Sequence, residues 1–591
     1  MSGKTKKYVA DCQHVPRNNG ENATKKVIFA RRRNKLTIHN RRFFMINYLE
    51  QLQGTIKNNW GAKALSNFQG EDFTFGELAT TIEEFHCFFR KIGIRKGDKI
   101  AICASNSARW AVTFLAINTY EAVVVPLLSE FLPENVSTLT THSESVILFA
   151  DKAIWEKMKA EDIPGVRCVI NNADYKILFC REKEVEEAYE SRKADLAAKY
   201  PNGFGREDVN FPTDNAKDLA VINYTSGTTS APKGVMLRYE SLSASIDFAI
   251  RKIPCGPGQS IVSMLPMGHI YGMVFEFLYP LSCGVNVHYL GKAPAASTLL
   301  KAVGQIKPYI IITVPLVMEK IYKSSIKPVL SKLPMRIATS IPGISNLIYG
   351  AIRKKLMATF GGNVCQFVMG GAALNPDVEK VFRKIGLPYT VGYGMTEAAP
   401  LLAYSQPWNY VQGSCGMKVD SADVRIDSPD PEHIAGEIQA KGLNICSGYF
   451  NNPEASANAF TEDGYLHTGD LGTMDSKGNI TIRGRSKNMI LSANGQNIYP
   501  EEVEAVINAQ DYVVESVVVD RSTKLVALVY LDKDAIAKSG MSKAAVDALP
   551  DHILKNVNRH VPAYSQVTKI ELVDAPFEKT PKMSIKRFLY K

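Results

Sequence analysis

The chain has 591 residues, of which 45% are hydrophobic and 22% charged, and its formal net charge is +11. This composition is ordinary for a globular protein and excludes the weakly hydrophobic, highly charged class of disordered chains. The ten cysteines show no C-x-x-C spacing, which argues against a disulfide framework or a zinc site and indicates reduced thiols in a cytosolic protein. No run of about 18 apolar residues is present, so we expect no transmembrane helix.

The positive charge is concentrated in residues 1–44. This segment holds twelve Lys and Arg residues against two acidic ones, so the rest of the chain is nearly neutral and no nucleic-acid partner is expected. It has no apolar periodicity, so we expect a disordered extension. Met45 opens the first well-patterned helix, which favours an upstream extension of the reading frame. A mitochondrial transit peptide and a nucleic-acid-binding arm remain alternatives for this segment.

Short apolar runs alternate with helical periods through most of the chain. Strands that alternate with helices predict a parallel sheet covered on both faces, so the expected fold class is α/β. After residue 484 the pattern changes to short alternating strands and a helix over 543–558, which indicates a compact α+β domain. We therefore expect a large, multi-subdomain α/β domain over 45–484 and a small, mobile α+β domain over 485–591.

The segment from Tyr224 to Gly234, YTSGTTSAPKG, combines five Ser and Thr hydroxyls with two glycines and a lysine. Glycine lets backbone N–H groups approach phosphate oxygens, the hydroxyls add neutral donors, and Lys233 supplies a positive charge. An apolar run precedes the segment, so the loop would leave the end of a strand, where α/β sheets bind ligands. Its spacing is not that of a Walker A loop. The segment predicts a nucleotide triphosphate site, and a Ser/Thr-rich surface loop is the alternative.

The same segment resembles the phosphate loop of adenylate-forming enzymes, the superfamily of acyl-CoA synthetases, luciferases and nonribosomal-peptide adenylation domains. Further strings continue the resemblance in the same order over roughly residues 50–591. They are VMGGAAL at 368–374, YTVGYGMTEAAP at 389–400, YLHTGDLG at 465–472 and RGRSK at 483–487. Taken singly, these strings are also typical of helix starts, turns and close packing of small residues.

The resemblance implies a role for each matching residue. Glu397 would ligate Mg²⁺, which prefers a carboxylate together with phosphate oxygens and waters, and Thr396 would bind phosphate. Asp470 would accept hydrogen bonds from the ribose hydroxyls, Tyr393 would stack near adenine, and Lys487 would be the hinge between the domains. The residues expected to bind ATP are Thr225, Ser226, Gly227, Thr228, Thr229, Gly370, Gly371, Ala372, Tyr393, Gly394, Asp470 and Arg485.

The segment PMGHIYG at 266–272 resembles the acyl-pocket segment of aryl and fatty acyl-CoA ligases. His269, Tyr271 and Gly272 would line the acyl or CoA pocket, with His269 as a gate on the carboxylate side, and Gly495 would border the pantetheine channel. Amino-acid adenylation domains carry an Asp in this region, whereas this chain has Tyr271. We therefore expect no buried carboxylate and no α-amine site there.

Residues 319–356 form a basic insertion, with eight Lys and Arg residues and one acidic residue among Ile, Leu, Val and Met. Short basic amphipathic helices of this kind lie on anionic membranes, and a solvated helical insertion is the alternative. This insertion, the GGAAL string and the C-terminal TP-x-x-x-IKR layout most resemble long-chain fatty acyl-CoA synthetases.

The chain departs from the family in its last motif. The family carries a catalytic lysine where this sequence, TPKMSIKR at 580–587, has Ser584. Serine cannot supply the charge, so a neighbouring lysine is needed during adenylation. Lys582 and Lys586 are the nearest candidates, and Lys586 is favoured because it lies in the part of the motif that keeps the family register.

The sequence thus predicts an AMP-forming fatty acid–CoA ligase that uses ATP, Mg²⁺ and CoA. It would activate a medium- or long-chain fatty acid as acyl-AMP and transfer the acyl group to CoA. We expect a cytoplasmic protein, with peripheral contact to the inner face of the membrane through 319–356 and no obligate protein partner. Two alternatives stay open: an acyl-AMP ligase that loads a carrier protein, and a nucleotide-binding pseudoenzyme, motivated by Ser584.

Overall fold

The computed structural model describes residues 46–225, 233–291, 296–491, 496–521, 524–580 and 585–590, without the side chains of 296 and 297. From Asn47 onward the chain forms one compact unit. Among the described residues, no helix combines the length and the apolar character needed to cross a membrane.

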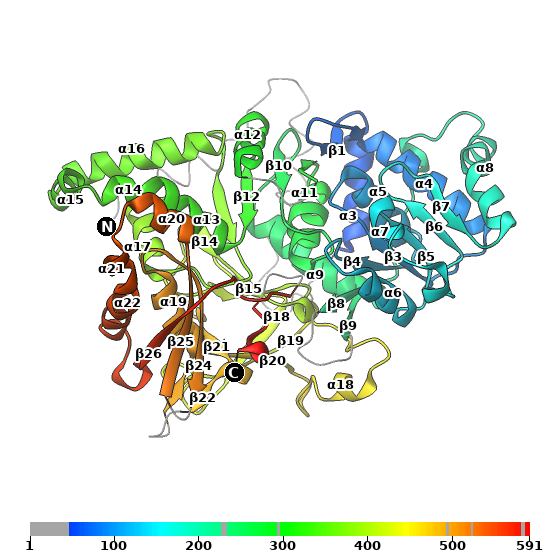
Figure 1. The fold of residues 1–591 in the computed structure, drawn as a ribbon. Helices are drawn as coiled ribbons and strands as arrows, with labels where there is room; N and C mark the ends of the chain where they lie inside the picture. The colour runs from blue at the N-terminus through cyan, green and yellow to red at the C-terminus, as the bar shows by residue number, and fades with distance from the viewer. Residues whose placement is uncertain are drawn as a thin grey trace, which may run out of the picture. The chain divides into compact units, whose positions relative to one another are not determined.

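The largest sheet has seven strands in the order β7-β6-β5-β3-β4-β8-β9 (Figure 1). Its central strands are parallel, whereas β7 and β9 run antiparallel to their neighbours. The strands β3 to β6 read as nearly continuous apolar runs because helices cover both faces of a parallel sheet. The strands are β3 (Lys99–Cys103), β4 (Val123–Leu127), β5 (Ser145–Ala150), β6 (Cys168–Asn171), β7 (Ile177–Cys180), β8 (Leu219–Thr225) and β9 (Lys233–Arg238). The helices of this region are α4 (Phe75–Lys91), α5 (Ala108–Thr119), α6 (Pro133–His142), α7 (Lys152–Trp155) and α8 (Lys183–Lys199).

Two smaller sheets follow, with orders β10-β11-β1-β2 and β12-β13-β14. The first contains β1 (Lys63–Asn67), β2 (Asp72–Thr74), β10 (Ser260–Ser263) and β11 (Asn286–Tyr289), beside α3 (Tyr48–Asn58), α9 (Tyr239–Lys252), α10 (Ile270–Gly272), the π-helix η4 (Met273–Leu278) and α11 (Tyr279–Ser282). The second contains β12 (Ile310–Thr313), β13 (Gln366–Met369) and β14 (Tyr389–Val391), beside α12 (Ala296–Ile306), α13 (Pro315–Ile321), η5 (Tyr322–Ile326), α14 (Lys327–Leu330), α15 (Leu333–Ser340), α16 (Ile344–Thr359) and α17 (Pro376–Ile385). All pairs within the second sheet are parallel.

Antiparallel strands complete this part of the chain. They are β15 (Tyr393–Gly394), β16 (Leu401–Tyr404), β17 (Met417–Lys418), β18 (Ala422–Asp427), β19 (Gly436–Gly442), β20 (Leu466–Met474) and β21 (Ile480–Arg485), with η6 (Thr396–Ala398) and α18 (Pro453–Ala457) between them. The strands β18 to β21 form one four-stranded meander. The parallel sheets with their helices confirm the predicted α/β class, and the antiparallel strands are added to them.

The C-terminal residues form a small α+β layer with a core of its own. Its sheet joins β24 (Val513–Arg521), β25 (Lys524–Leu531) and β26 (Lys569–Val573), and its helices are α19 (Pro500–Asn508), α20 (Lys533–Ser539), α21 (Lys543–Asp547) and α22 (Leu549–Asn558). Val503, Ile507, Val529 and Val557 pack together inside it. The single helix predicted over 543–558 is wrong, because the chain breaks at Ala548, and Pro550 fits only in the first turn of α22.

Candidate active site

A lysine, a tyrosine and a glutamate from three distant segments meet at the start of β9. Lys233 is the first residue of β9, where its backbone pairs with Thr225 at the end of β8. Glu397 lies in η6 and is buried, with 9% of its surface exposed. The Tyr449 hydroxyl donates a hydrogen bond to Glu397 Oε1 at 3.0 Å, and Lys233 Nζ lies 5.0 Å from the centre of the Tyr449 ring. We call these three side chains the Lys-Tyr-Glu cluster.

The backbone fixes this cluster from both sides. The segment 447–450 runs antiparallel to β9, with hydrogen bonds from Met236 N–H to the Gly448 carbonyl at 3.0 Å and from Phe450 N–H to the Gly234 carbonyl at 2.8 Å. The Cys446 N–H donates to the Glu397 carbonyl at 2.8 Å. Burial raises the pKa of Tyr449, so its hydroxyl stays a donor at neutral pH.

The cluster fits a magnesium-bound polyphosphate. Within the described part of the chain, no donor reaches Glu397 Oε2, which leaves one carboxylate oxygen for a ligand. No group of three or more His, Cys, Asp or Glu side chains suited to a metal occurs among the described residues. A single carboxylate fits Mg²⁺, which takes its remaining ligands from phosphate and water, whereas it does not fit zinc.

Tyr393, Asp470 and Arg485 form a second group. Tyr393 Oη donates to Asp470 Oδ2 at 2.7 Å, and Arg485 Nε lies 2.7 Å from Asp470 Oδ1. The sheet brings them together, since Asp470 on β20 is the register partner of Arg485 on β21. Burial raises the pKa of Asp470, although Arg485 and the Tyr393 hydroxyl oppose that shift. The group presents a carboxylate, an aromatic ring and a half-exposed guanidinium, which suit a ribose, a base and a phosphate.

Two of the predicted glycines allow close approaches. A Cβ on Gly394 would lie 1.8 Å from the carbonyl oxygen of Pro400, so no other residue fits there without moving the backbone. A Cβ on Gly370 would lie 3.0 Å from the Tyr271 ring, which places the predicted acyl-pocket tyrosine directly against the GGAA segment. Tyr271 Oη also donates to the carbonyl of Thr313 at 3.3 Å. The structure therefore brings Tyr271 and Gly370 together.

The other residues of the acyl segment have local structural contacts. His269 Nδ1 accepts a hydrogen bond from the Tyr271 N–H at 3.2 Å and caps α10. A Cβ on Gly272 would lie 2.7 Å from the Pro266 carbonyl oxygen, so this glycine permits a tight turn. The proposed gating by His269 stays a prediction.

The expectation of no buried carboxylate in this region is wrong. Glu276 lies in η4 with 0% exposure, and its Oε2 accepts hydrogen bonds from the Ser263 hydroxyl and from the N–H groups of Met264 and Leu265 at 3.1, 3.0 and 2.8 Å. Its Oε1 has no partner among the described residues. Burial raises the pKa of Glu276 to about 8, so the carboxyl is mostly protonated at neutral pH and offers little charge to an ammonium group.

Several predicted residues are not joined to either group. Lys586 Nζ pairs with Glu578 Oε2 at 3.2 Å within the C-terminal layer. Lys487 lies in the short helix η7 (Ser486–Asn488), which directly follows β21, and Ala372 is exposed beside Gly371, whose φ is +83°. Thr396 is buried as the first residue of η6. Outside the described residues lie Ser226, Gly227, Thr228, Thr229, Gly495, Lys582 and Ser584.

Sequence reasoning did not single out Tyr449 or Glu276. Tyr449 stands in the string SGYF, and a glycine followed by two aromatic residues after a strand is a weak signal of a packed turn. Glu276 is a lone acid in the apolar stretch MVFEFL, and a charge at a position that must be buried is the stronger signal.

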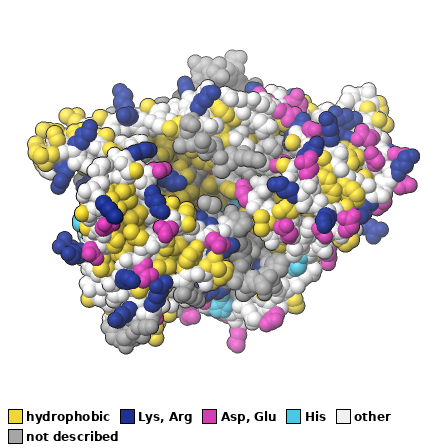
Figure 2. Space-filling view, in the orientation of Figure 1, with side chains coloured by type: hydrophobic (Ala, Val, Ile, Leu, Met, Phe, Trp, Pro, Cys, Tyr) yellow, Lys and Arg dark blue, Asp and Glu magenta, His cyan; other side chains and the backbone are white. Residues whose placement is uncertain are grey.

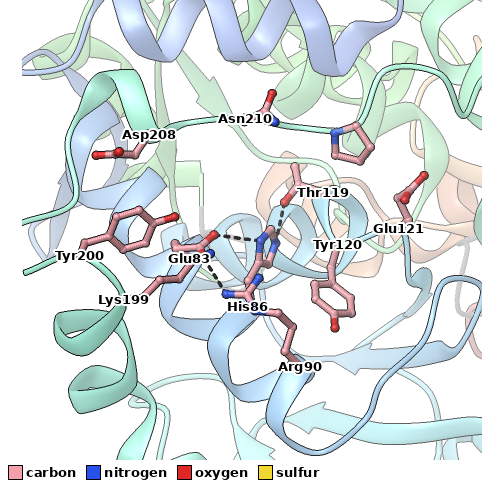
Figure 3. Close-up of a pocket in the computed structure, with 11 residues that line it drawn as sticks. Glu83, His86, Arg90, Thr119, Tyr120, Glu121, Lys199, Tyr200, Asp208 and Asn210 are labelled. Atoms are coloured by element: carbon pink, nitrogen blue, oxygen red, sulfur yellow. Dashed lines mark hydrogen bonds and ion pairs between the residues drawn. The ribbon is translucent and has the colours of Figure 1, made fainter.

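A polar pocket of about 440 Å³ lies elsewhere, lined by α4, α8 and the chain around Tyr200 to Pro212 (Figure 3). Figure 3 shows Glu83, His86 and Arg90 pointing toward one another. Glu83 lies 2.7 Å from Arg90, 2.9 Å from Lys199 and 3.3 Å from His86. Although burial opposes it, these partners lower the pKa of Glu83 to about 2. The charged side chains pair with one another, as in a structural ion-pair network. None of the predicted site residues lines this pocket.

Comparisons with known proteins match the chain to families and relatives, and the first family model includes the Lys-Tyr-Glu cluster. A model of the AMP-binding enzyme family matches residues 52–450, and a model of the AMP-binding enzyme C-terminal domain matches residues 487–590. A Mycobacterium bovis protein named long-chain-fatty-acid–CoA ligase FadD15 is 28% identical over 565 residues, which cover 87% of this chain and 90% of that protein. An Arabidopsis thaliana protein named long-chain-fatty-acid–[acyl-carrier-protein] ligase AEE15, chloroplastic, is 25% identical over 599 residues, covering 87% and 80%.

The fold also matches a solved structure. It is that of o-succinylbenzoate coenzyme A synthetase from Bacillus subtilis, in complex with ATP and a magnesium ion. The two share a TM-score of 0.69 and 20% identity over 92% of this chain and 98% of that one. At this identity the match shows a common fold.

Proposed function

The chain belongs to the AMP-binding enzyme family, and we propose that it is an ATP-dependent ligase. The enzyme would activate a medium- or long-chain fatty acid as acyl-AMP and transfer the acyl group to CoA. The family match confirms the resemblance to adenylate-forming enzymes. The observation that carries the proposal is the meeting of Lys233, Tyr449 and Glu397 at the end of the glycine- and hydroxyl-rich loop. Relatives named as long-chain fatty acid ligases support the substrate class.

In the first half-reaction, a carboxylate oxygen of the fatty acid attacks the α-phosphorus of ATP. The new O–P bond forms as the bond to the β-phosphate oxygen breaks, and pyrophosphate leaves with the electron pair. Lys233 would offset the charge of the phosphates, and Tyr449 would hold Glu397 in a single orientation toward the metal. Mg²⁺ bound at Glu397 would neutralise the phosphate oxygens. Catalysis of this kind depends mainly on positioning and on electrostatic stabilisation.

The nucleoside would be held by the Tyr393-Asp470-Arg485 group. The Asp470 oxygens retain lone pairs beyond the bonds from Tyr393 and Arg485, so they can accept from the ribose hydroxyls. Gly394 and Gly370 would shape the wall beside adenine, because they let the Pro400 carbonyl and the Tyr271 ring approach the backbone closely. These assignments extend the family roles to the residues that the structure brings together.

In the second half-reaction, the thiolate of CoA attacks the acyl carbon and AMP leaves. We propose that the C-terminal layer turns about Lys487 between the two steps, with Gly495 at the pantetheine channel. The acceptor CoA is favoured by the names of several relatives. A carrier protein is the second candidate acceptor, because one relative is named as an acyl-carrier-protein ligase.

The acyl pocket favours an uncharged chain over an amino acid. Tyr271 stands where amino-acid adenylation needs an acid, and the nearby Glu276 is mostly protonated at neutral pH. No disulfide joins the nine described cysteines, which supports the proposed cytoplasmic location.

A pyrophosphate-release assay with a panel of fatty, aryl and amino acids tests the reaction. We expect release with medium- or long-chain fatty acids that depends on ATP and Mg²⁺, and mass spectrometry of the products with CoA and with holo-carrier protein identifies the acceptor. Absence of pyrophosphate release above background with every acid, while ATP still binds, would establish the pseudoenzyme alternative.

A further inference from the structure

The helices α15 and α16 expose a row of large apolar side chains. Leu333, Ile337, Ile341, Ile344 and Leu347 have exposed fractions of 67, 58, 43, 43 and 76%. Leu333 and Ile337 are four residues apart in α15, and Ile344 and Leu347 are three apart in α16, which are spacings that place two side chains on one side of their helix. Ile341 lies in the short connection between the two helices. We call these five residues the apolar face.

The fold does not use these side chains for its core. None of the eight residues of α15 is buried, and Leu356 is the buried residue of α16. Inward-facing residues of α16, such as Tyr349 and Ile352, pack against the core of the β12-β13-β14 sheet instead. Monomeric proteins rarely expose contiguous apolar residues without a partner, so the apolar face indicates a binding surface.

The charges within the segment that carries the apolar face have one sign. The chain has no acidic residue from Lys320 to Pro376. Lys332 and Arg336 are exposed at the start and middle of α15, and neither has an ion-pair partner among the described residues. Lys354 and Lys355 are exposed near the end of α16. Figure 2 shows hydrophobic side chains beside Lys and Arg where these helices lie.

We propose that the apolar face binds the surface of an anionic phospholipid bilayer, with α15 lying in the interface. A basic amphipathic helix binds such a surface by burying its apolar side chains among the acyl chains while its cations meet lipid phosphates. The complete lack of acidic residues matches a polyanionic surface, and the leucines and isoleucines match its hydrocarbon. A nucleic acid would satisfy the charges and leave these apolar residues in water.

Two other basic residues of the segment, Lys323 and Lys327, contact the C-terminal layer. Lys323 Nζ donates to the carbonyl of Asn508 at 2.9 Å, and Lys327 forms an ion pair with Asp511. These two lysines hold the C-terminal layer and are excluded from the proposed surface. The proposal rests on the exposed side chains alone and is independent of the proposed reaction.

Co-sedimentation with vesicles tests the proposal in the full-length chain. We expect the protein to bind vesicles of phosphatidylcholine with phosphatidylserine and to bind vesicles of phosphatidylcholine alone much more weakly. The double variant Ile337→Asp/Leu347→Asp should lose at least about tenfold in affinity, since two charges would enter the hydrocarbon boundary. The vesicle affinity of the double variant Lys332→Glu/Arg336→Glu should fall by about fivefold or more for each cation removed. Wild type and variants share residues 1–44, so a difference between them reports on the face.

The matched control is Leu132→Asp, because Leu132 is 65% exposed and precedes α6, outside the face. It should bind vesicles as the wild type does, and all variants should keep the wild-type melting temperature. Unchanged vesicle binding by both double variants would overturn the proposal. The rival occupant of the apolar face is a second copy of the chain, and sedimentation velocity without lipid tests for it. If the wild type is a dimer that does not bind vesicles, and Ile337→Asp/Leu347→Asp converts it to a monomer, the face binds a second copy of the chain.

Discussion

Tyr449 connects β9 to η6, although it belongs neither to the string at 224–234 nor to the string at 389–400. Its hydroxyl is the described donor to the buried Glu397, and its ring lies under the Lys233 ammonium. An ammonium over an aromatic ring is attracted to it, and a hydrogen bond from a buried hydroxyl fixes the orientation of the carboxylate that accepts it. One side chain therefore holds both charges of the cluster in place.

Tyr449→Phe should separate these two effects. The phenyl ring keeps the contact with Lys233, whereas Glu397 loses a hydrogen bond to a charged group, which is worth about tenfold to a hundredfold. We expect that decrease in kcat/KM for acyl-AMP formation, with a higher Mg²⁺ requirement, measured by pyrophosphate exchange across a magnesium titration. Lys233→Ala and Glu397→Ala should lose about a hundredfold to a thousandfold.

Tyr465→Phe is the matched control, because Tyr465 also donates to a carboxylate, that of Asp423 at 2.7 Å, on an exposed part of the chain. It should leave the reaction unchanged. Wild-type magnesium dependence in a folded Tyr449→Phe protein would contradict the assignment of Glu397 to the metal.

The raised pKa of Glu276 predicts how the stability of the protein depends on pH. Its pKa is raised from the ordinary 4.5 to about 8, so the native state keeps a proton that the unfolded state loses. Stability is therefore full below pH 4.5 and falls as the pH rises toward 8, by about 1.4 kcal/mol per unit at most. Glu276→Gln, which does not titrate, should flatten this part of the profile of melting temperature against pH. The exposed Glu184→Gln should keep the wild-type slope, and equal slopes in all three proteins would show that Glu276 is ionised in the native state.

Residue chemistry explains which parts of the site could be predicted. Lys233 stands in a string whose composition suits a phosphate, whereas the roles expected for Asp470 and Glu397 come from the resemblance to adenylate-forming enzymes. Tyr449 and Glu276 act through distant partners, and nothing in their local sequence specifies those partners. Glu276 shows the limit most clearly, since its donors on Ser263, Met264 and Leu265 depend on how β10 meets η4.

At the scale of elements, η7 is the short segment between the meander and the C-terminal layer. Met489 N–H donates to the Arg485 carbonyl at 3.1 Å across it, and Asn488 Nδ2 donates to Glu501 Oε1 at 2.6 Å. A short segment that connects two layers suits the proposed pivot, which must change its backbone angles between two states.

Lys487→Pro should obstruct that change, because proline fixes φ near about −65° and restricts the preceding residue. We expect near-normal acyl-AMP formation and a much slower thioester step when acyl-AMP and CoA are supplied. Lys487→Ala is the control, because it removes the side chain and leaves the backbone free. Its thioester step should be faster than that of Lys487→Pro. Equal loss of both steps in the proline variant would place the pivot elsewhere or indicate misfolding.

The elements themselves were largely predictable from apolar periodicity. Strands such as Lys99–Cys103 and Lys524–Leu531 are bounded by polar residues and are apolar enough to be placed by sequence alone. The break at Ala548 was missed because the apolar period continues across it, and only Pro550 marks the boundary.

On the scale of the whole molecule, several of the described polar contacts that join the C-terminal layer to the larger part of the compact unit end on backbone carbonyls. Asn375 Nδ2 donates to the Ala505 carbonyl at 3.2 Å, and Lys323 donates to the carbonyls of Asn508 and Val513 at 2.9 and 3.3 Å. Backbone carbonyls accept from any donor, so sequence reasoning had no signal for these contacts. Polar contacts of this kind fit a layer that changes its orientation.

Deleting residues 1–44 should leave both activity and melting temperature close to those of the wild type. The compact unit begins at Asn47, and the deleted segment has no apolar pattern with which to join a core. Differential scanning fluorimetry and pyrophosphate release test this directly. A truncated chain that fails to fold, or folds without activity, would show that the segment is part of the enzyme.

The final prediction concerns the cation that we propose the C-terminal layer supplies during adenylation, since this chain has Ser584 where the family carries a lysine. Lys586 is 35% exposed and pairs with Glu578 at 3.2 Å, so an ammonium is available beside the motif once that exposed pair opens. Lys586→Ala should therefore slow acyl-AMP formation more than it slows thioester formation from supplied acyl-AMP. Lys569→Ala is the matched control, because Lys569 lies on the same layer and pairs with Glu571 at 2.9 Å. Ser584→Lys should raise the first half-reaction or leave it unchanged. If Lys586→Ala and Lys582→Ala both adenylate normally, the charge comes from another residue; if only Ser584→Lys releases pyrophosphate, the natural chain is a pseudoenzyme.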